Sequence, residues 1–225
     1  MTKAICMPSK FFQLTRLALA AGAICALAGC TLLGVANERM NGNKVDAKYV
    51  PNKKEKMLVL VESYGLSLDS GIETQHMTLV LRRTLEDEKI ASLVDQDALE
   101  RLKDTDGRQY APLTIADIGR KVGARQVLYV NVWRSEIVKP PGSGQMRGQM
   151  DAVVKIVDAT TGDTRWPNDA PSEAVQITTN WFPESAQKTE TDLRAQMADE
   201  MAADIGKLFH DYHTEQGPVD KMNVD

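Results

Sequence analysis

Histidines are the first residues to consider for chemistry in this chain of 225 residues, which has only three. His210 and His213 are three residues apart, so they share one side of a helix if that segment is helical. Imidazole and carboxylate groups bind zinc, and Asp204 and Asp211 lie nearby in the sequence. Cations near the end of an amphipathic helix also stabilise its negative end, and we favour this simpler interpretation. With His76 far away in the sequence, we predict no metal site.

Patterns for nucleophilic catalysis or phosphate binding do not occur in the sequence. There is no Gly-x-Ser-x-Gly elbow, and Gly142-Ser143-Gly144 lacks the lysine and helix that complete a phosphate-binding loop. Acidic pairs such as Asp95 and Asp97 stand in highly charged stretches, which is typical of a solvated face rather than of general acid–base groups. We therefore predict a protein that is not an enzyme and uses no cofactor.

Cys30 is the one residue to which the sequence assigns a specific chemical fate. It follows an apolar run, Leu17–Gly29, which is preceded by Lys3, Lys10 and Arg16 and by no acidic residue. A positive start, a short apolar core and small residues before a break are typical of a secretory signal. The run is shorter than the ~20 residues that span a bilayer. The alternative is an uncleaved N-terminal anchor in which the cysteine is incidental.

The residues Leu27-Ala28-Gly29-Cys30 resemble the lipobox of bacterial lipoproteins. The resemblance implies cleavage after the signal peptide 1–29, acylation of Cys30 (with palmitate or a similar chain) and a membrane anchor at that residue. Two or more acyl chains anchor stably, since each buried methylene contributes ~0.8 kcal/mol. Thr31 is not acidic, and in this group of proteins that implies the outer membrane, with the protein facing the periplasm.

Composition limits the partners of the mature chain. The signal contains three basic residues and no acidic one, so its removal changes the formal net charge from −4 to −7. An acidic protein does not attract nucleic acid, so we predict no nucleic-acid partner. Cys6 and Cys25 leave with the signal and Cys30 carries lipid, which leaves no disulfide to stabilise the fold. A hydrophobic core must therefore hold the domain together.

Tryptophans and prolines supply the candidate partner surface. Trp166 and Trp181 stand beside prolines and loops, which favours exposure and contact with a partner. Trp133 lies in an apolar run and is predicted in the core. Pro140 and Pro141 belong to the loop 139–145, and loops on rigid scaffolds often carry recognition.

The pattern of apolar residues alternates between strands and helices in the first half of the domain. Continuous apolar runs predict buried strands, and apolar residues every three or four positions predict helices. Thr114 and Gly123 are suited to begin and end one helix. The predicted elements are strands at 57–63 and 90–94 and helices at 70–85, 95–102 and 114–122.

The second half predicts an antiparallel meander closed by a helix. A strand at 126–137 pairs as a hairpin with an alternating strand at 145–157, and a further strand follows at 173–180. An apolar stripe predicts a long helix at 191–212. The fold class is therefore α/β (α+β), as one domain with a mixed sheet of about five strands and helices packed over it. The predicted boundaries are a tether at 30–56, a domain at 57–213 and a polar tail at 214–225.

Three stretches carry a resemblance to known families. They are 57–85, 122–130 and 154–166, the last containing Asp158-Ala159-Thr160-Thr161-Gly162. Together they resemble the small α/β domain of the curli-secretion channel lipoprotein, the penicillin-binding-protein activator lipoproteins and the N-terminal domain of the Tol–Pal propeller protein. The resemblance implies a non-enzymatic domain that binds envelope proteins or assembles into rings.

A membrane pore of the curli-secretion type needs further long amphipathic strands. Only the hairpin 126–157 offers strands of about the required 9–11 residues, and Arg134 and Glu136 interrupt the side that would face lipid. We interpret the apolar half of the hairpin as core. The sequence leaves open whether the hairpin ever enters a membrane.

The sequence thus predicts a lipid-anchored envelope protein that acts as a protein-interaction module in envelope assembly or maintenance. Its partner is an envelope protein that the sequence does not identify, and its oligomeric state is open. The alternatives are an oligomeric component of an outer-membrane secretion channel and an envelope hydrolase.

Overall fold

The structure, a computed structural model, describes residues 43–63, 70–105, 112–184 and 189–214. The predicted signal peptide, Cys30 and nearly all of the predicted polar tail lie outside these residues. The described chain forms two units. The smaller unit contains β1 (Lys44–Val45) paired antiparallel with β9 (Tyr212–His213). The larger unit, Asp46–Asp211, contains every other described element.

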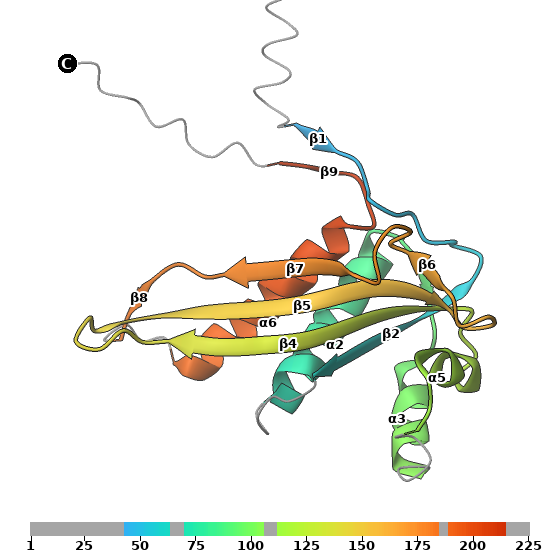
Figure 1. Cartoon of the computed structure of the whole chain (residues 1–225), viewed down its shortest axis with the longest axis horizontal. Helices are drawn as coiled ribbons and strands as arrows, with labels where there is room; N and C mark the ends of the chain where they lie inside the picture. The colour runs from blue at the N-terminus through green and yellow to red at the C-terminus, as the bar shows by residue number, and fades with distance from the viewer. Residues whose placement is uncertain (1–42, 64–69, 106–111, 185–188, 215–225) are drawn as a thin grey trace, which may run out of the picture. The chain divides into compact units, whose positions relative to one another are not determined.

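The larger unit is built on a mixed sheet, which confirms the predicted fold class (Figure 1). Strand β2 lies between β3 and β4 and runs parallel to both. Strand β5 pairs antiparallel with β4 and also with the shorter strands β6, β7 and β8. The sheet has seven strands, because short pieces add to the five that the sequence predicted. Their bounds are β2 (Lys56–Ser63), β3 (Ser92–Leu93), β4 (Gln126–Val138), β5 (Gln145–Asp158), β6 (Thr164–Trp166), β7 (Glu173–Thr178) and β8 (Phe182–Pro183).

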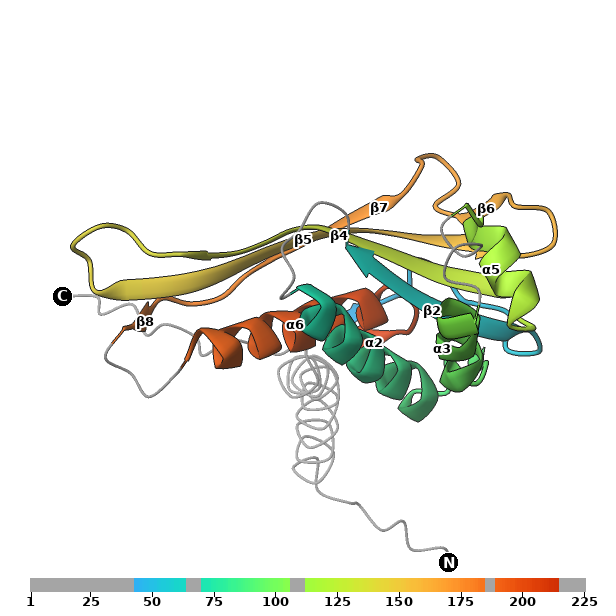
Figure 2. The ribbon, with the colours of Figure 1, turned by 90° about the horizontal axis from the view of Figure 1, so that it is seen from below.

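Four helices of the described chain pack against this sheet. They are α2 (Ser70–Asp87), α3 (Gln96–Thr105), α5 (Ile115–Lys121) and α6 (Glu190–Lys207). Helices α2 and α6 lie together under one face, and α3 and α5 lie at one end of the sheet (Figure 2). Helices α5 and α6 each begin with a capping box, formed by Thr114 with Asp117 and by Thr189 with Asp192. The sequence predicted Thr114 in this role.

Alternation along the two long strands divides their side chains between two cores. Leu128 and Val130 of β4 pack with the apolar stripes of α2 and α6, while Val127 packs with residues of α3 and α5. Gly148 of β5 faces α6, where a Cβ atom would overlap the side chain of Met197. The helix therefore lies close to the sheet there. No described helix has the length and apolar character needed to cross a bilayer.

The domain begins earlier along the chain than the predicted boundary at residue 57. Residues 46–56, which the sequence places in the tether, belong to the larger unit. The Tyr49 amide donates to the Leu208 carbonyl (3.1 Å), and the Gln126 side chain donates to the carbonyls of Asn52 (2.9 Å) and Glu55 (3.1 Å). These contacts use backbone groups, which no hydrophobic pattern reveals.

The last helix ends before the predicted Tyr212. Helix α6 stops at Lys207 with Leu208 as its C-cap, and the buried Phe209 continues the apolar stripe beyond the helix. A ring nitrogen of His210 lies 2.9 Å from the Gly206 carbonyl.

Candidate functional site

The structure exchanges the roles predicted for two tryptophans. Trp166 is 6% exposed and packs against Tyr49 and Phe209, so the prediction that it lies on a partner surface is wrong. Trp133, predicted in the core, is 49% exposed. Trp181 is 40% exposed, as a partner surface requires.

The prolines of the predicted surface lie at the tip of the long hairpin. Pro140 and Pro141 are exposed in the turn between β4 and β5. The turn is fixed locally, because the Ser143 hydroxyl donates to the Pro140 carbonyl (2.8 Å) and Gly142 and Gly144 adopt positive φ.

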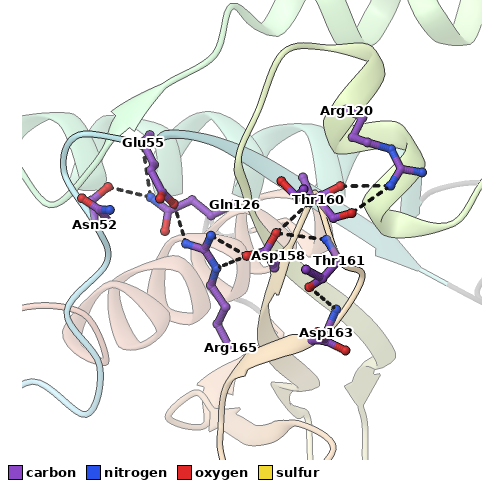
Figure 3. A network of polar contacts seen from close by, with 10 residues as sticks. Asn52, Glu55, Arg120, Gln126, Asp158, Thr160, Thr161, Asp163 and Arg165 are labelled. Atoms are coloured by element: carbon purple, nitrogen blue, oxygen red, sulfur yellow. Dashed lines mark hydrogen bonds and ion pairs between the residues drawn. The ribbon is translucent and has the colours of Figure 1, made fainter.

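One polar cluster lies where the N-terminal segment of the domain meets the turn after β5 (Figure 3). The Arg165 guanidinium donates twice to the Asp158 carboxylate, at 3.0 and 2.6 Å, and once to Glu55 at 2.5 Å. The other Asp158 oxygen accepts from the Thr160 amide (2.7 Å) and the Thr161 amide (3.2 Å). We call Glu55, Asp158 and Arg165 the Arg165 network.

Hydrogen bonding perturbs the acid at the centre of this network. The Arg165 side chain, and then the two backbone amides, lower the pKa of Asp158 from 3.8 to about 2. The side chains of the three network residues are between 19% and 24% exposed. The network therefore consists of charges that are already paired and largely withdrawn from water, which suits structure rather than ligand binding.

A second polar cluster lies further along β4 and β5, toward the hairpin turn, around a β-bulge. Val132 pairs with Ala152, but Arg134 pairs with Asp151, so Trp133 is an extra residue in β4. Bulges redirect side chains, and this one leaves Trp133 exposed beside Arg134, whose guanidinium carbon is 5.6 Å from the indole centroid.

Asp151 holds the arginine of this pair. Its side chain is 2% exposed, and its Oδ2 atom lies 2.6 Å from Arg134 Nε. The N–H is not aligned with that oxygen, so the contact is an ion pair rather than a hydrogen bond. The Asp151 carboxylate raises the pKa of Arg134. Glu136 lies further away, 3.6 Å from the guanidinium.

Trp181 forms a similar pair on the same side of the sheet. The Arg147 guanidinium carbon lies 4.5 Å from the Trp181 ring centroid. With its amide oriented to suit both neighbours, Gln149 accepts from Arg147 (3.0 Å) and donates to Glu136 (3.2 Å). Arg147, Gln149 and Asp151 alternate along β5, so all three project from one face.

These side chains form one surface on the sheet face that α2 and α6 leave uncovered. Figure 2 shows no described helix over this face near the hairpin end, because α3 and α5 lie at the other end. We call the surface the Trp–Arg face and define it as Trp133, Arg134, Glu136, Arg147, Gln149 and Trp181. It offers two flat aromatic rings, two guanidinium groups, one amide and one carboxylate.

Histidine and acidic residues do not gather into a ligand set in the described structure. No group of three or more His, Cys, Asp or Glu side chains there is placed to hold a metal ion. His76 instead lies 2.8 Å from Asp199, joining α2 to α6.

Sequence reasoning missed Trp133, Arg134 and Arg147 as site residues. The bulge in β4 hid Trp133 and Arg134, because it shifts the alternation by one residue and leaves no mark in composition. Arg147 lies on the polar face of β5, but the sequence does not show that it stacks on Trp181. Trp166 was misplaced because its neighbours, Tyr49 and Phe209, come from distant parts of the chain.

Comparison with known proteins finds similarity of fold. No family model and no curated protein sequence matches the chain. Among solved structures, a dodecamer of a PelC point variant from Paraburkholderia phytofirmans is 14% identical, with a TM-score of 0.44 over 75% of this chain and 97% of that one. Lipoprotein GNA1162 from Neisseria meningitidis is 16% identical, with a TM-score of 0.43 over 67% of this chain and 97% of that one. At this level of identity the similarity concerns the fold alone.

Proposed function

We propose that this protein is a lipid-anchored envelope protein that acts as a non-enzymatic interaction module in cell-envelope assembly or maintenance. The Trp–Arg face carries the proposal for the folded domain. The signal-like segment that ends at Cys30 carries it for the anchor.

An exposed tryptophan leaves a large apolar surface in water, and burying that surface against a partner favours binding. Tryptophan and arginine are the residues most enriched among those that dominate binding energy between proteins. Trp133 and Trp181 each hold an arginine against the ring, so their side chains are partly ordered before any partner arrives. A partner then loses less conformational entropy in ordering this surface.

The anchor limits where the Trp–Arg face acts. Fifteen residues separate Cys30 from Asp46, where the larger unit begins. Fully extended, this segment spans about 50 Å at most. The partner surface therefore stays near the membrane that holds the lipid, which we propose is the outer membrane on its periplasmic side.

Lipidation is tested by replacing Cys30. Cells that express the wild type should incorporate radiolabelled palmitate into the protein, and the Cys30→Ala variant should not and should keep its signal peptide or leave the membrane. Continued labelling of the variant would contradict the assignment.

The interaction module is tested by chemical crosslinking in intact membranes followed by purification of the tagged protein. We expect a discrete crosslinked species for the wild type and at least a tenfold lower yield for the variant W133A/W181A. The variant Arg125→Ala, which changes an exposed residue outside the face, should keep the wild-type yield. Equal yields from all three proteins would contradict the proposal.

The oligomeric secretion-channel alternative predicts a different particle size. Size-exclusion chromatography of the mature protein in detergent separates a ring of many copies from a monomer or dimer. A ring would favour that alternative over the module.

A further inference from the structure

Strand β2 has one edge that no described strand completes. Strand β3 pairs with it only at Lys56 and Met57, through Ser92 and Leu93. The Lys56 carbonyl accepts from the Arg125 amide, which precedes β4, and the Met57 carbonyl accepts from the Val94 amide on the outer side. Backbone groups of successive residues in a strand point to opposite edges. The N–H and C=O groups of Val59 and Val61 therefore point to the outer edge, beyond the end of β3.

This outer edge lies in a cleft between two helices. Val59 and Val61 line the cleft with α2 residues on one side and α3 residues on the other, around a volume of about 260 Å³. Leu79 of α2 lines it too and is 58% exposed, the second most exposed of the large apolar side chains that the structure describes. Leu99 of α3 adds a buried apolar wall.

We propose that this cleft binds an extended peptide segment of a partner protein, which adds a strand to the outer edge of β2. Only an extended backbone presents donors and acceptors at the spacing that Val59 and Val61 require. Neighbouring strands lie about 4.8 Å apart, so one added strand brings its side chains into contact with the helices that flank the cleft. This surface is separate from the Trp–Arg face.

The lining also specifies the side chains of the segment. Residues of the added strand that face the cleft contact Leu79 and Leu99 and must be apolar. The cleft also carries Lys103, whose ion pair with Glu100 is long, at 3.7 Å. Arg82 lines the cleft too, but its guanidinium already donates to the Val94 carbonyl (3.1 Å) and to Gln96 (3.3 Å). An acidic residue beside the apolar ones can take over Lys103 at little cost. The segment is therefore a β-prone peptide with alternating apolar residues and a flanking Asp or Glu.

Disulfide trapping tests the proposal on the mature protein in detergent. The probe is the amidated peptide Cys-Val-Thr-Val-Glu, and the protein carries Leu79→Cys at the exposed wall of the cleft. Leu79→Cys alters an exposed side chain, so the fold is retained. We expect its equilibrium disulfide with the peptide to be at least tenfold more stable than that of Ala203→Cys, an exposed position on α6. The mature parent protein, which has no added cysteine, gives the background.

Two further measurements connect trapping to strand addition. N-methylation of the Thr and second Val of the peptide removes one N–H on each edge of the added strand, so the edge that meets β2 loses a donor, and the tenfold preference should be abolished. Amide hydrogen exchange at Val59 or Val61 should slow in the trapped complex. Equal trapping at positions 79 and 203, or undiminished trapping of the methylated peptide, would overturn the proposal. So would a disulfide dimer of Leu79→Cys that forms without peptide in preference to Ala203→Cys, because the occupant would then be a second copy of this chain.

Discussion

The Arg165 network and the Trp–Arg face both combine arginine with acidic residues, yet their surroundings differ. Arg165 donates three hydrogen bonds to two carboxylates and is 21% exposed. Arg134 contacts one buried carboxylate without an aligned hydrogen bond and is 40% exposed. The adjacent tryptophans show the same contrast, since Trp166 is buried and Trp133 is not.

The comparison separates residues that hold the fold from residues available to a partner. The charges of the Arg165 network are already hydrogen-bonded to one another and shielded from water, so they have few groups free to bind a ligand. Losing the network removes the contacts between the elements that it joins. An exposed ring beside an arginine contributes little to the stability of the fold. In an interface, the ring can bury apolar surface and the arginine can pair with a charged group of the partner. A search for site residues by perturbed pKa alone would have selected Asp158, which belongs to the Arg165 network that holds the fold.

The largest expected effect comes from Trp166→Ala. Removing a buried tryptophan deletes the contacts with Tyr49 and Phe209 and leaves a cavity, so the free energy of unfolding should fall by about 3–5 kcal/mol. Urea denaturation followed by circular dichroism measures it. A loss below about 1 kcal/mol would show that Trp166 is not a core residue.

Arg165→Ala should have the next largest effect. It leaves Glu55 and Asp158 without their shared partner, and a loss of about 2–3 kcal/mol is expected for hydrogen bonds to charged groups. The matched control is Arg125→Ala, at an exposed arginine, which should stay within about 0.5 kcal/mol of the wild type. Similar losses in the two variants would remove the distinction between the regions.

The lowered pKa of Asp158 predicts that the free energy of unfolding depends on pH. Its folded pKa of about 2 lies below the ordinary value of 3.8, so it stabilises the fold above pH 4 and this contribution is lost as the pH falls toward 2. The urea midpoint of the wild type should exceed that of Asp158→Asn at pH 6. The difference should shrink between pH 4 and pH 2. A difference that stays constant across this range would contradict the ion pair.

Trp133→Ala should have the smallest effect on stability. The ring is half exposed, so the free energy of unfolding should change by less than about 1 kcal/mol, although crosslinking to the partner should fall. Differential scanning calorimetry of the two tryptophan variants gives the direct contrast. A destabilisation as large as that of Trp166→Ala would assign Trp133 to the fold.

Sequence patterns predicted the elements better than the surfaces. The strands at 57–63, 126–137 and 145–157 and the cap at Thr114 follow from local apolar runs and turn chemistry, and the structure confirms them. The docking of residues 46–56 depends on backbone hydrogen bonds to Leu208 and Gln126, which are distant in sequence. The exposure of Trp133 depends on a bulge, which is a property of strand pairing rather than of composition.

Position-specific photocrosslinking tests most directly whether the Trp–Arg face, and not the region of the Arg165 network, meets the partner. A photoreactive amino acid is placed at Trp133 or at Asp163, an exposed residue in the turn beside the network. We expect a discrete crosslinked product from position 133 in living cells, reduced by Trp181→Ala, and none from position 163. Identical products from both positions, or a product at 133 that Trp181→Ala leaves unchanged, would contradict the account.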